Sequence, residues 1–243
     1  MSPVLAFILV ILVCAAGSFV QTVASFGTNI IVMALLPLFL PTGVSLAVAL
    51  VGGFVTSTVL TIRFRKQICW KHIVLPMVFS VIGTVGGLIM GAGVSSSLLK
   101  RMLGVLLVLM AIWQFRFAAR VRIPANSLSG GIAGIVSGLL GAFFSISAPP
   151  LVLYYSNAYD DKQRYMATLQ TVFCIQGLSI IVARMGLAQW TWSSWPYLIA
   201  CLIGLALGNV PGKLVFDKLD TGKFKIGVYI FMAIAGIYMI ITG

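Results

Sequence analysis

Long apolar segments follow one another along the chain, and short groups of charged or polar residues separate them. Six of these segments cover residues 44–62, 73–90, 98–115, 165–183, 195–212 and 226–242. Each is about long enough to cross the roughly 30 Å of hydrocarbon in a bilayer as one α-helix. The pattern therefore predicts a series of membrane-spanning helices.

Two further apolar stretches, residues 3–40 and 124–156, are interrupted. The first is interrupted near residues 25–29, where the sequence reads Ser-Phe-Gly-Thr-Asn. The interruptions of the second are Gly138, Gly141, Pro149 and Pro150. Glycine weakens a helix and proline removes a backbone N–H donor. Each stretch is therefore expected to form a pair of short or broken helices rather than two full crossings.

Glycine, tryptophan and proline residues recur in the same order in the two halves of the chain. The matched residues are Gly17 with Gly131, Gly27 with Gly141, Trp70 with Trp190, Pro76 with Pro196, and Gly83, Gly87 and Gly91 with Gly204, Gly208 and Gly212. Such a colinear series indicates a duplication, with repeats at residues 1–120 and 124–243 and a basic cytoplasmic linker at 116–124. The glycine ladders are expected to let helix backbones pack closely.

The positive charges predict how the repeats are oriented. Short loops on the cytoplasmic side of membrane proteins are rich in lysine and arginine. Of the 16 lysines and arginines, all but Lys100, Arg101 and Arg184 fall in loops that this rule assigns to the cytoplasm. The loop after Ile62 is basic, whereas its counterpart near Trp190 has almost no charge, so equivalent loops are expected on opposite sides. The predicted fold is an all-α integral membrane protein with two inverted-topology repeats, each a broken helical hairpin plus three transmembrane helices.

Composition narrows the class of protein. Apolar residues make up 60% of the 243 residues, charged residues only 8%, and the mean hydropathy is +1.12. These values exclude a soluble domain, and the net charge of +12 is explained by topology rather than by nucleic-acid binding. All four acids lie in predicted loops, the single histidine lies at a loop end, and the four cysteines are far apart. No enzyme, metal site or cofactor is therefore expected, and a carboxylate-coupled cation transporter is disfavoured.

Uncharged polar residues gather at the two interruptions. Where a helix restarts, its first N–H groups lack internal partners and carry the positive end of the helix dipole, which favours an anion. Two such breaks in inverted repeats are expected to meet near the bilayer midplane. The predicted substrate-binding residues are Gln21, Ser25, Gly27, Thr28, Asn29, Gly141, Ser145, Ser147 and Gln170. Gln176 and Asn209 are secondary candidates, and Arg184 is read either as an anion contact or as a side chain that extends to the membrane interface.

Two segments carry a resemblance to a known family. Residues 137–141 (Ser-Gly-Leu-Leu-Gly), 149–154 (Pro-Pro-Leu-Val-Leu-Tyr) and 164–169 (Arg-Tyr-Met-Ala-Thr-Leu) resemble the second-half signature of the TauE/SafE sulfite-exporter family of membrane permeases. Residues 21–37 resemble its first-half partner. The chain departs from the family pattern at positions 28–29 and 142–144, where the family often carries a glycine cluster. The resemblance implies transport of small sulfur-containing anions, such as sulfite or sulfonates, across a bacterial inner membrane.

The expected mechanism is secondary transport by alternating access, in which one repeat rocks against the other around the midplane site. Expulsion of each negative charge from a cytoplasm at negative potential gains about 2.3 kcal/mol per 100 mV, which favours export. The alternatives are an anion-selective channel, a proton-coupled importer of small carboxylates or sulfonates, and an assembly subunit that transports nothing. The expected partners are a small anionic solute and the lipid bilayer, and a homo-oligomer is left open.

Overall fold

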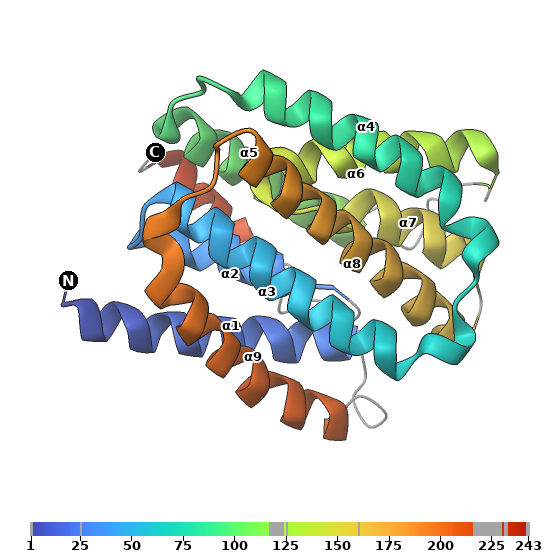
Figure 1. Ribbon diagram of the computed structural model, residues 1–243, viewed down its shortest axis with the longest axis horizontal. Helices are drawn as coiled ribbons and strands as arrows, with labels where there is room; N and C mark the ends of the chain where they lie inside the picture. The colour runs from blue at the N-terminus through green and yellow to red at the C-terminus, as the bar shows by residue number, and fades with distance from the viewer. Residues whose placement is uncertain are drawn as a thin grey trace. The chain divides into compact units, whose positions relative to one another are not determined.

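The computed structural model describes residues 2–24, 26–116, 124, 126–159, 161–215, 230 and 233–241, and these residues form helices and turns without a β-strand. The α-helices are α1 (Pro3–Ala24), α2 (Thr28–Leu35), α3 (Thr42–Arg63), α4 (Val74–Gly91), α5 (Ser96–Arg116), α6 (Ser127–Phe144), α7 (Ala148–Ala158), α8 (Lys162–Gly186) and α9 (Trp195–Val215) (Figure 1). Short 3-10 turns are η1 (Leu36–Leu38), η2 (Arg65–Gln67), η3 (Trp70–His72) and η4 (Trp192–Ser194). Residues 233–241 are also helical.

In the described part of the chain, 6 helices are long and apolar enough to cross a membrane. They confirm the predicted crossings at 44–62, 73–90, 165–183 and 195–212. α5 covers the predicted segment 98–115. Within the predicted segment 226–242, residues 233–241 are helical, and residues 226–229, 231, 232 and 242 lie outside the described residues.

The remaining two candidate spans, Pro3–Val23 and Ser127–Phe144, correct one prediction. Each interrupted stretch was expected to form a pair of short or broken helices, and each instead joins a first helix, α1 or α6, that is long enough to span to a short second helix. Only α2, with 8 residues, and α7, with 11, are short. Glycines inside α6 do not break it because they lie in close helix contacts, where the absence of a side chain is an advantage.

The two interruptions themselves are confirmed. α1 ends at Ala24 and α2 begins at Thr28, with Gly27 at a φ of 141° that L-residues rarely adopt. α6 ends at Phe144 and α7 begins at Ala148, with Ser145 in the left-handed region at a φ of 58°. Each short helix therefore starts after a sharp change of backbone direction.

The chain forms two compact units, and in each of them a pair of spanning helices packs closely across glycines. In the unit made of Met1–Gly52, Val94–Val121 and Thr191–Gly243, α9 runs along α1 in the same direction (Figure 1). A Cβ atom on Gly204 would lie 2.4 Å from the carbonyl oxygen of Ile11, and one on Gly208 would lie 2.0 Å from that of Ala15. Only glycine permits this approach, so the predicted packing role of the second ladder is confirmed.

The other unit, Gly53–Gly93 and Arg122–Trp190, pairs α4 with α6 in the same way. A Cβ atom on Gly83 would lie 2.3 Å from the carbonyl oxygen of Ile135, and one on Gly138 would lie 2.2 Å from that of Ser80. The packing role predicted for the first ladder is therefore also confirmed, and glycines of α6 contribute to the same contact.

Helix starts recur at a nearly constant interval. α2 and α7 begin at Thr28 and Ala148, 120 positions apart, and α3 and α8 begin at Thr42 and Lys162, again 120 apart. α4 and α9 begin at Val74 and Trp195, 121 apart. This spacing supports a duplication. Each compact unit draws helices from both predicted repeats, and the repeat boundaries and their inverted orientation stay predictions.

The predicted match of Gly27 with Gly141 is wrong in structural terms. Gly27 is the N-cap of α2 and lies inside the first interruption, whereas Gly141 lies in the last turn of α6, before the second one. The two glycines are 114 positions apart, fewer than the 120 that separate the starts of α2 and α7. Matching glycines by sequence alone placed the second break too early.

Candidate functional site

The first interruption brings the start of α2 back against α1. The backbone N–H of Thr28 donates to Oε1 of Gln21 at 3.3 Å, and the N–H of Ile31 donates to the carbonyl oxygen of Gly27 at 2.9 Å. Gln21 and Thr28 are both buried. Gln21 therefore acts as a long-range cap that fixes the first turn of α2, a structural role in addition to the predicted binding role.

The side chain of Thr28 is fully buried, and within the described residues its Oγ1 atom has no hydrogen-bond partner. Two nearby hydroxyls do have partners. Ser18 donates to the carbonyl oxygen of Leu205 at 3.1 Å, and Thr22 donates to the carbonyl oxygen of Ser18 at 2.8 Å. A buried hydroxyl without a partner costs about 1–3 kcal/mol. Within the described residues of this break, the Thr28 hydroxyl is therefore a buried donor that no protein group satisfies.

The start of α2 lies level with the middle of the neighbouring helices. The Thr28 methyl group is 3.6 Å from the Cβ position of Gly52, which lies midway along the 22-residue α3. The same Cβ position is 3.9 Å from Leu205, midway along the 21-residue α9. Because α3 and α9 are both candidate spans, the first turn of α2 lies far from either end of them.

The second interruption gathers four polar or small residues of α6, α7 and α8. The Ser137 hydroxyl donates to the carbonyl oxygen of Ser147 at 2.7 Å, and Nε2 of Gln176 donates to Oγ of Ser137 at 3.2 Å. A Cβ atom on Gly141 would lie 2.5 Å from Oγ of Ser147, so glycine leaves the space that the serine occupies. Of the two glutamines considered, Gln176 rather than Gln170 lies at this break.

The polar contacts of Ser137 lie beside the middle of a candidate span. Gly138 packs against Ser80 and Thr84, which lie midway along the 18-residue α4. The Ser80 hydroxyl is buried and has no partner within the described residues, whereas Thr84 donates to the carbonyl oxygen of Gly138 at 3.5 Å. Ser80 and Thr84 were not among the residues predicted from the sequence. Their position four residues apart beside Gly83 was the signal that could have identified them.

The two helix starts differ in the number of backbone donors that they offer. In α7, Pro149 and Pro150 occupy two of the first three positions, and proline has no N–H. In α2, each residue of the first turn carries an N–H. The predicted cradle of main-chain amides therefore suits α2, whereas the second break depends more on side chains such as Ser137 and Gln176.

The other predicted residues have mixed positions. Ser25 lies outside the described residues, and Asn29 is partly exposed at the second position of α2. Ser145 is buried as the C-cap of α6, where its N–H donates to the carbonyl oxygen of Gly141 at 2.9 Å. Gln170 is buried and its Nε2 lies 3.8 Å from Sδ of Met166. Since it precedes Gln176 by about 9 Å along the helix axis, the structure does not bring Gln170 to the second break.

Asn209 on α9, a secondary candidate, is buried in the first unit, and its Oδ1 has no partner within the described residues. It follows Leu205 by four positions, so it lies on the same helix face one turn further on. Asn209 therefore stays a candidate.

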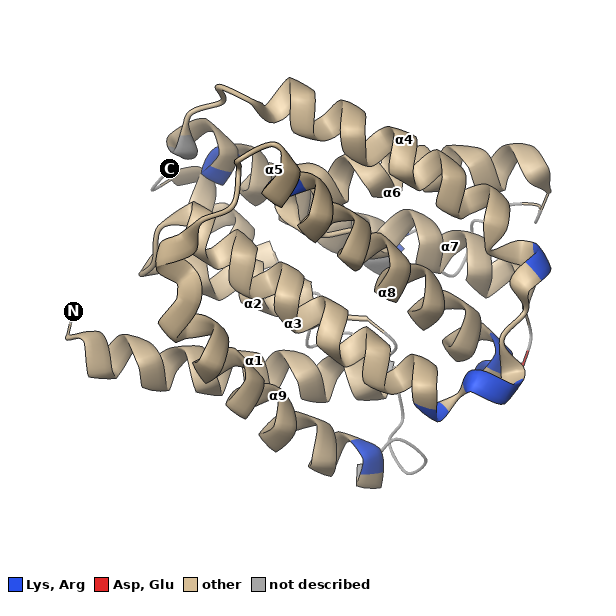
Figure 2. Ribbon diagram, in the orientation of Figure 1, with Lys and Arg blue, Asp and Glu red and all other residues tan. Residues whose placement is uncertain are grey.

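Charge is excluded from the helix interiors. In Figure 2 the lysines and arginines of the described residues lie mainly near helix ends and in turns. Asp161, the one acid within the described ranges, caps the start of α8 by accepting from the N–H of Arg164 at 3.0 Å. No group of three potential metal ligands occurs among the described residues. Within the described residues, the polar side chains at the two breaks, Thr28, Ser137 and Gln176, are therefore uncharged, and Arg184 lies at the edge of the second break.

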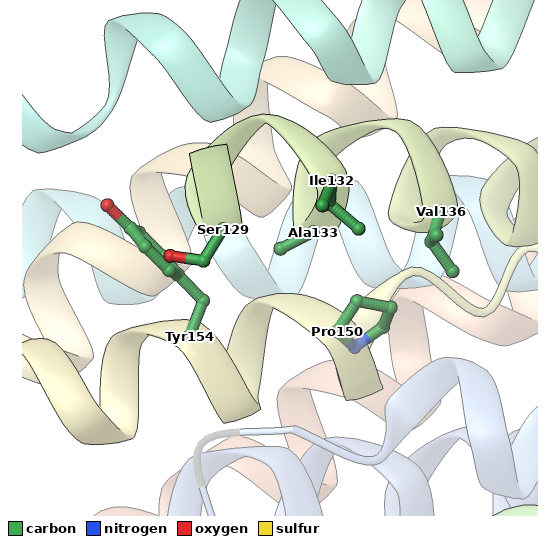
Figure 3. A pocket seen from close by; sticks show the side chains of 6 residues that line it. All are labelled: Ser129, Ile132, Ala133, Val136, Pro150 and Tyr154. Carbon is green, nitrogen blue, oxygen red and sulfur yellow. The ribbon is translucent and has the colours of Figure 1, made fainter. Parts of the chain in front are cut away.

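A cleft of about 220 Å³ lies between α6 and α7, apart from the polar groups of the second break. It is lined by Ser129, Ile132, Ala133, Val136, Pro150 and Tyr154 (Figure 3). The hydroxyls of Ser129 and Tyr154 lie at one end of the cleft, and the rest of its wall is apolar (Figure 3). Such a wall offers little to a hydrated anion.

Comparison with known proteins identifies the family of this chain. The sequence model of the family Sulfite exporter TauE/SafE matches residues 9–239 of the 243. No curated protein and no solved structure matches the chain. Because the family match covers nearly the whole chain, it includes both interruptions, five of the 6 candidate spans in full, and the first span from residue 9 onward. The chain belongs to the TauE/SafE sulfite-exporter family and is a multi-pass membrane transporter rather than an enzyme.

Proposed function

We propose that the protein exports small sulfur-containing anions, such as sulfite or sulfonates, across the bacterial inner membrane by alternating access. One observation carries the proposal: the unpartnered hydroxyl of Thr28 lies at the start of α2, beside the middle of α3. An anion that reaches this position meets the positive end of a helix dipole and a hydroxyl donor.

The chemistry of the two breaks favours an oxyanion. Thr28, Ser137 and Gln176 all carry donors, and a sulfite or sulfonate group offers several oxygen acceptors. Asp161, at the far end of α8, is the acid within the described ranges, so no described carboxylate repels a negative solute at either break.

The direction of transport follows from the membrane potential. A cytoplasm at negative potential expels each negative charge with a gain of about 2.3 kcal/mol per 100 mV. Export therefore requires no coupling ion, and the motion that exposes the site first to one side and then to the other supplies alternating access.

The direct test is a flux assay with purified protein in liposomes, comparing sulfite, methanesulfonate, acetate and chloride. Saturable sulfite or sulfonate flux with accelerated exchange by unlabelled solute on the opposite side supports the proposal. Flux that does not saturate and shows no counterflow identifies an anion channel instead. Flux that depends on a proton gradient and favours carboxylates identifies an importer, and no flux for any solute contradicts a transport role.

The Thr28 hydroxyl allows a test in which stability and transport change in opposite directions. Replacing Thr28 with valine keeps the shape of the side chain and removes a buried hydroxyl that has no described partner. We expect the unfolding free energy to stay equal or to rise by up to about 1 kcal/mol. Loss of one hydrogen bond to a charged solute is expected to raise the sulfite KM about tenfold.

Thr171→Val is the matched control, because Thr171 is buried in α8 and its hydroxyl donates to the carbonyl oxygen of Ala167 at 2.7 Å. This variant should lose a little stability and keep its KM. An unchanged KM in Thr28→Val would remove Thr28 from the site. Liposome flux and thermal unfolding in detergent measure the two properties on the same preparations.

A further inference from the structure

Arg184 is a half-buried cation at the end of α8 next to the second break. Its Nη2 atom donates to the carbonyl oxygen of Ala142, in the last turn of α6. Its Nε atom is buried and has no hydrogen-bond partner within the described residues. The Nη2 donor of the guanidinium therefore has a partner, whereas its Nε donor has none among the described residues.

No described carboxylate can neutralise this charge. The acid within the described ranges, Asp161, caps the opposite end of α8, 23 residues earlier in the chain. At a rise of about 1.5 Å per residue, the two side chains start about 34 Å apart. A guanidinium inside the apolar part of a membrane protein is costly without an opposite charge or a full set of acceptors.

Arg184 shares a helix face with the residues that line the second break. Gln176, Ile180 and Arg184 follow one another at intervals of four, which places them in one row along α8. Gln176 donates to Ser137, and the end of Ile180 lies 2.9 Å from the Cβ position of Gly141. Arg184 continues this row to Ala142, so it lies at the edge of the gathered polar groups.

We propose that Arg184 is a specificity-determining residue that selects anions at the second break, an inference that rests on the proposed function. The Nη2 atom holds the last turn of α6, where exposed carbonyl oxygens form the negative end of the helix dipole. The Nε–H group is left for an oxygen of the sulfite or sulfonate, which supplies the missing negative charge. The planar guanidinium can make both contacts at once, whereas a lysine ammonium lacks this fork of donors.

The test compares Arg184→Gln and Arg184→Lys with the native protein in liposome flux and in thermal unfolding with and without sulfite. Glutamine is polar but uncharged, so we expect the sulfite KM to rise about tenfold or more. The preference for sulfite over methanesulfonate, which carries less charge, should fall. Lysine should restore part of the charge preference without restoring the native KM.

Arg164→Gln is the control, because Arg164 is an exposed arginine in the first turn of the same helix. It should leave the KM and the sulfite-induced rise in Tm unchanged. If Arg184→Gln lowers the maximal rate for all solutes equally, lowers Tm, and keeps the native KM, then Arg184 only caps α6 and the inference is wrong.

Failure of the proposed function is distinguishable from failure of this inference. Native protein that neither transports sulfite nor gains Tm from it contradicts both. The role of Arg184 alone is contradicted if the native protein transports sulfite and gains Tm from it, and the Arg184→Gln variant keeps the same KM, anion preference and gain in Tm.

Discussion

Replacing Gly138 with alanine is expected to lower the unfolding free energy of the protein by about 3 kcal/mol. The added Cβ atom would lie 2.2 Å from the carbonyl oxygen of Ser80 and 2.7 Å from the backbone nitrogen of Thr84. Both are backbone atoms in the middle of α4, so no side-chain rotation relieves the clash. α4 and α6 would have to separate along their whole contact, and a lower Tm in detergent measures the result.

Gly86→Ala in α4 is the matched control for this prediction. The Cβ position of Gly86 has no neighbouring atom within 4 Å. Alanine is a better helix former than glycine by about 1 kcal/mol, so this variant should be as stable as the native protein or slightly more so. Equal destabilisation by the two substitutions would show that the α4–α6 contact does not depend on the absence of a side chain.

The same reasoning extends to the other compact unit. A Cβ atom on Gly208 would lie 2.0 Å from the carbonyl oxygen of Ala15, again a backbone atom. The two glycine-mediated pairs, α1 with α9 and α4 with α6, therefore have equivalent roles although they lie in different units. This equivalence is the structural counterpart of the recurrent glycine ladders in the sequence.

Much of the fold could be predicted because its determinants are local. Runs of apolar residues specify spanning helices, and Gly27 marks the first break because its φ of 141° suits only glycine. The lengths of α1 and α6 were not predicted, since a glycine inside a helix looks the same in the sequence whether it breaks the helix or packs against another backbone. Gly138, which contacts Ser80, is of the second kind.

The site was predicted less completely because its contacts join distant parts of the chain. Thr28 and Gln21 were both proposed as ligands, but only the structure shows that the Gln21 side chain accepts from the Thr28 N–H. Gln170 and Gln176 lie on one helix among largely apolar sequence neighbours, yet only Gln176 contacts Ser137. Which of two such residues faces a break depends on helix rotation, and the sequence pattern of α8 does not define it.

Replacing Gly27 with alanine is expected to reduce sulfite flux about a hundredfold at equal amounts of protein in the membrane, the size of loss that follows when positioned groups shift by about 1 Å. At a φ of 141° an alanine is strained, and its Cβ atom would lie 2.6 Å from Cγ1 of Val20. To relieve the backbone strain or the clash with Val20, the backbone before Thr28 has to rotate. The N–H of Thr28 then leaves Gln21, and the first turn of α2 no longer presents its donors beside the middle of α3.

Gly93→Ala separates loss of the site from general backbone strain. Gly93 also has a positive φ, 93°, but its Cβ position has no atom within 4 Å and it lies between α4 and α5, away from both breaks. This variant should lose about 1 kcal/mol of stability from strain and keep its flux. A Gly27→Ala protein that inserts normally and transports sulfite at the native rate would mean that the orientation of the α2 start is not what binds the anion, and the site would have to be sought at the second break alone.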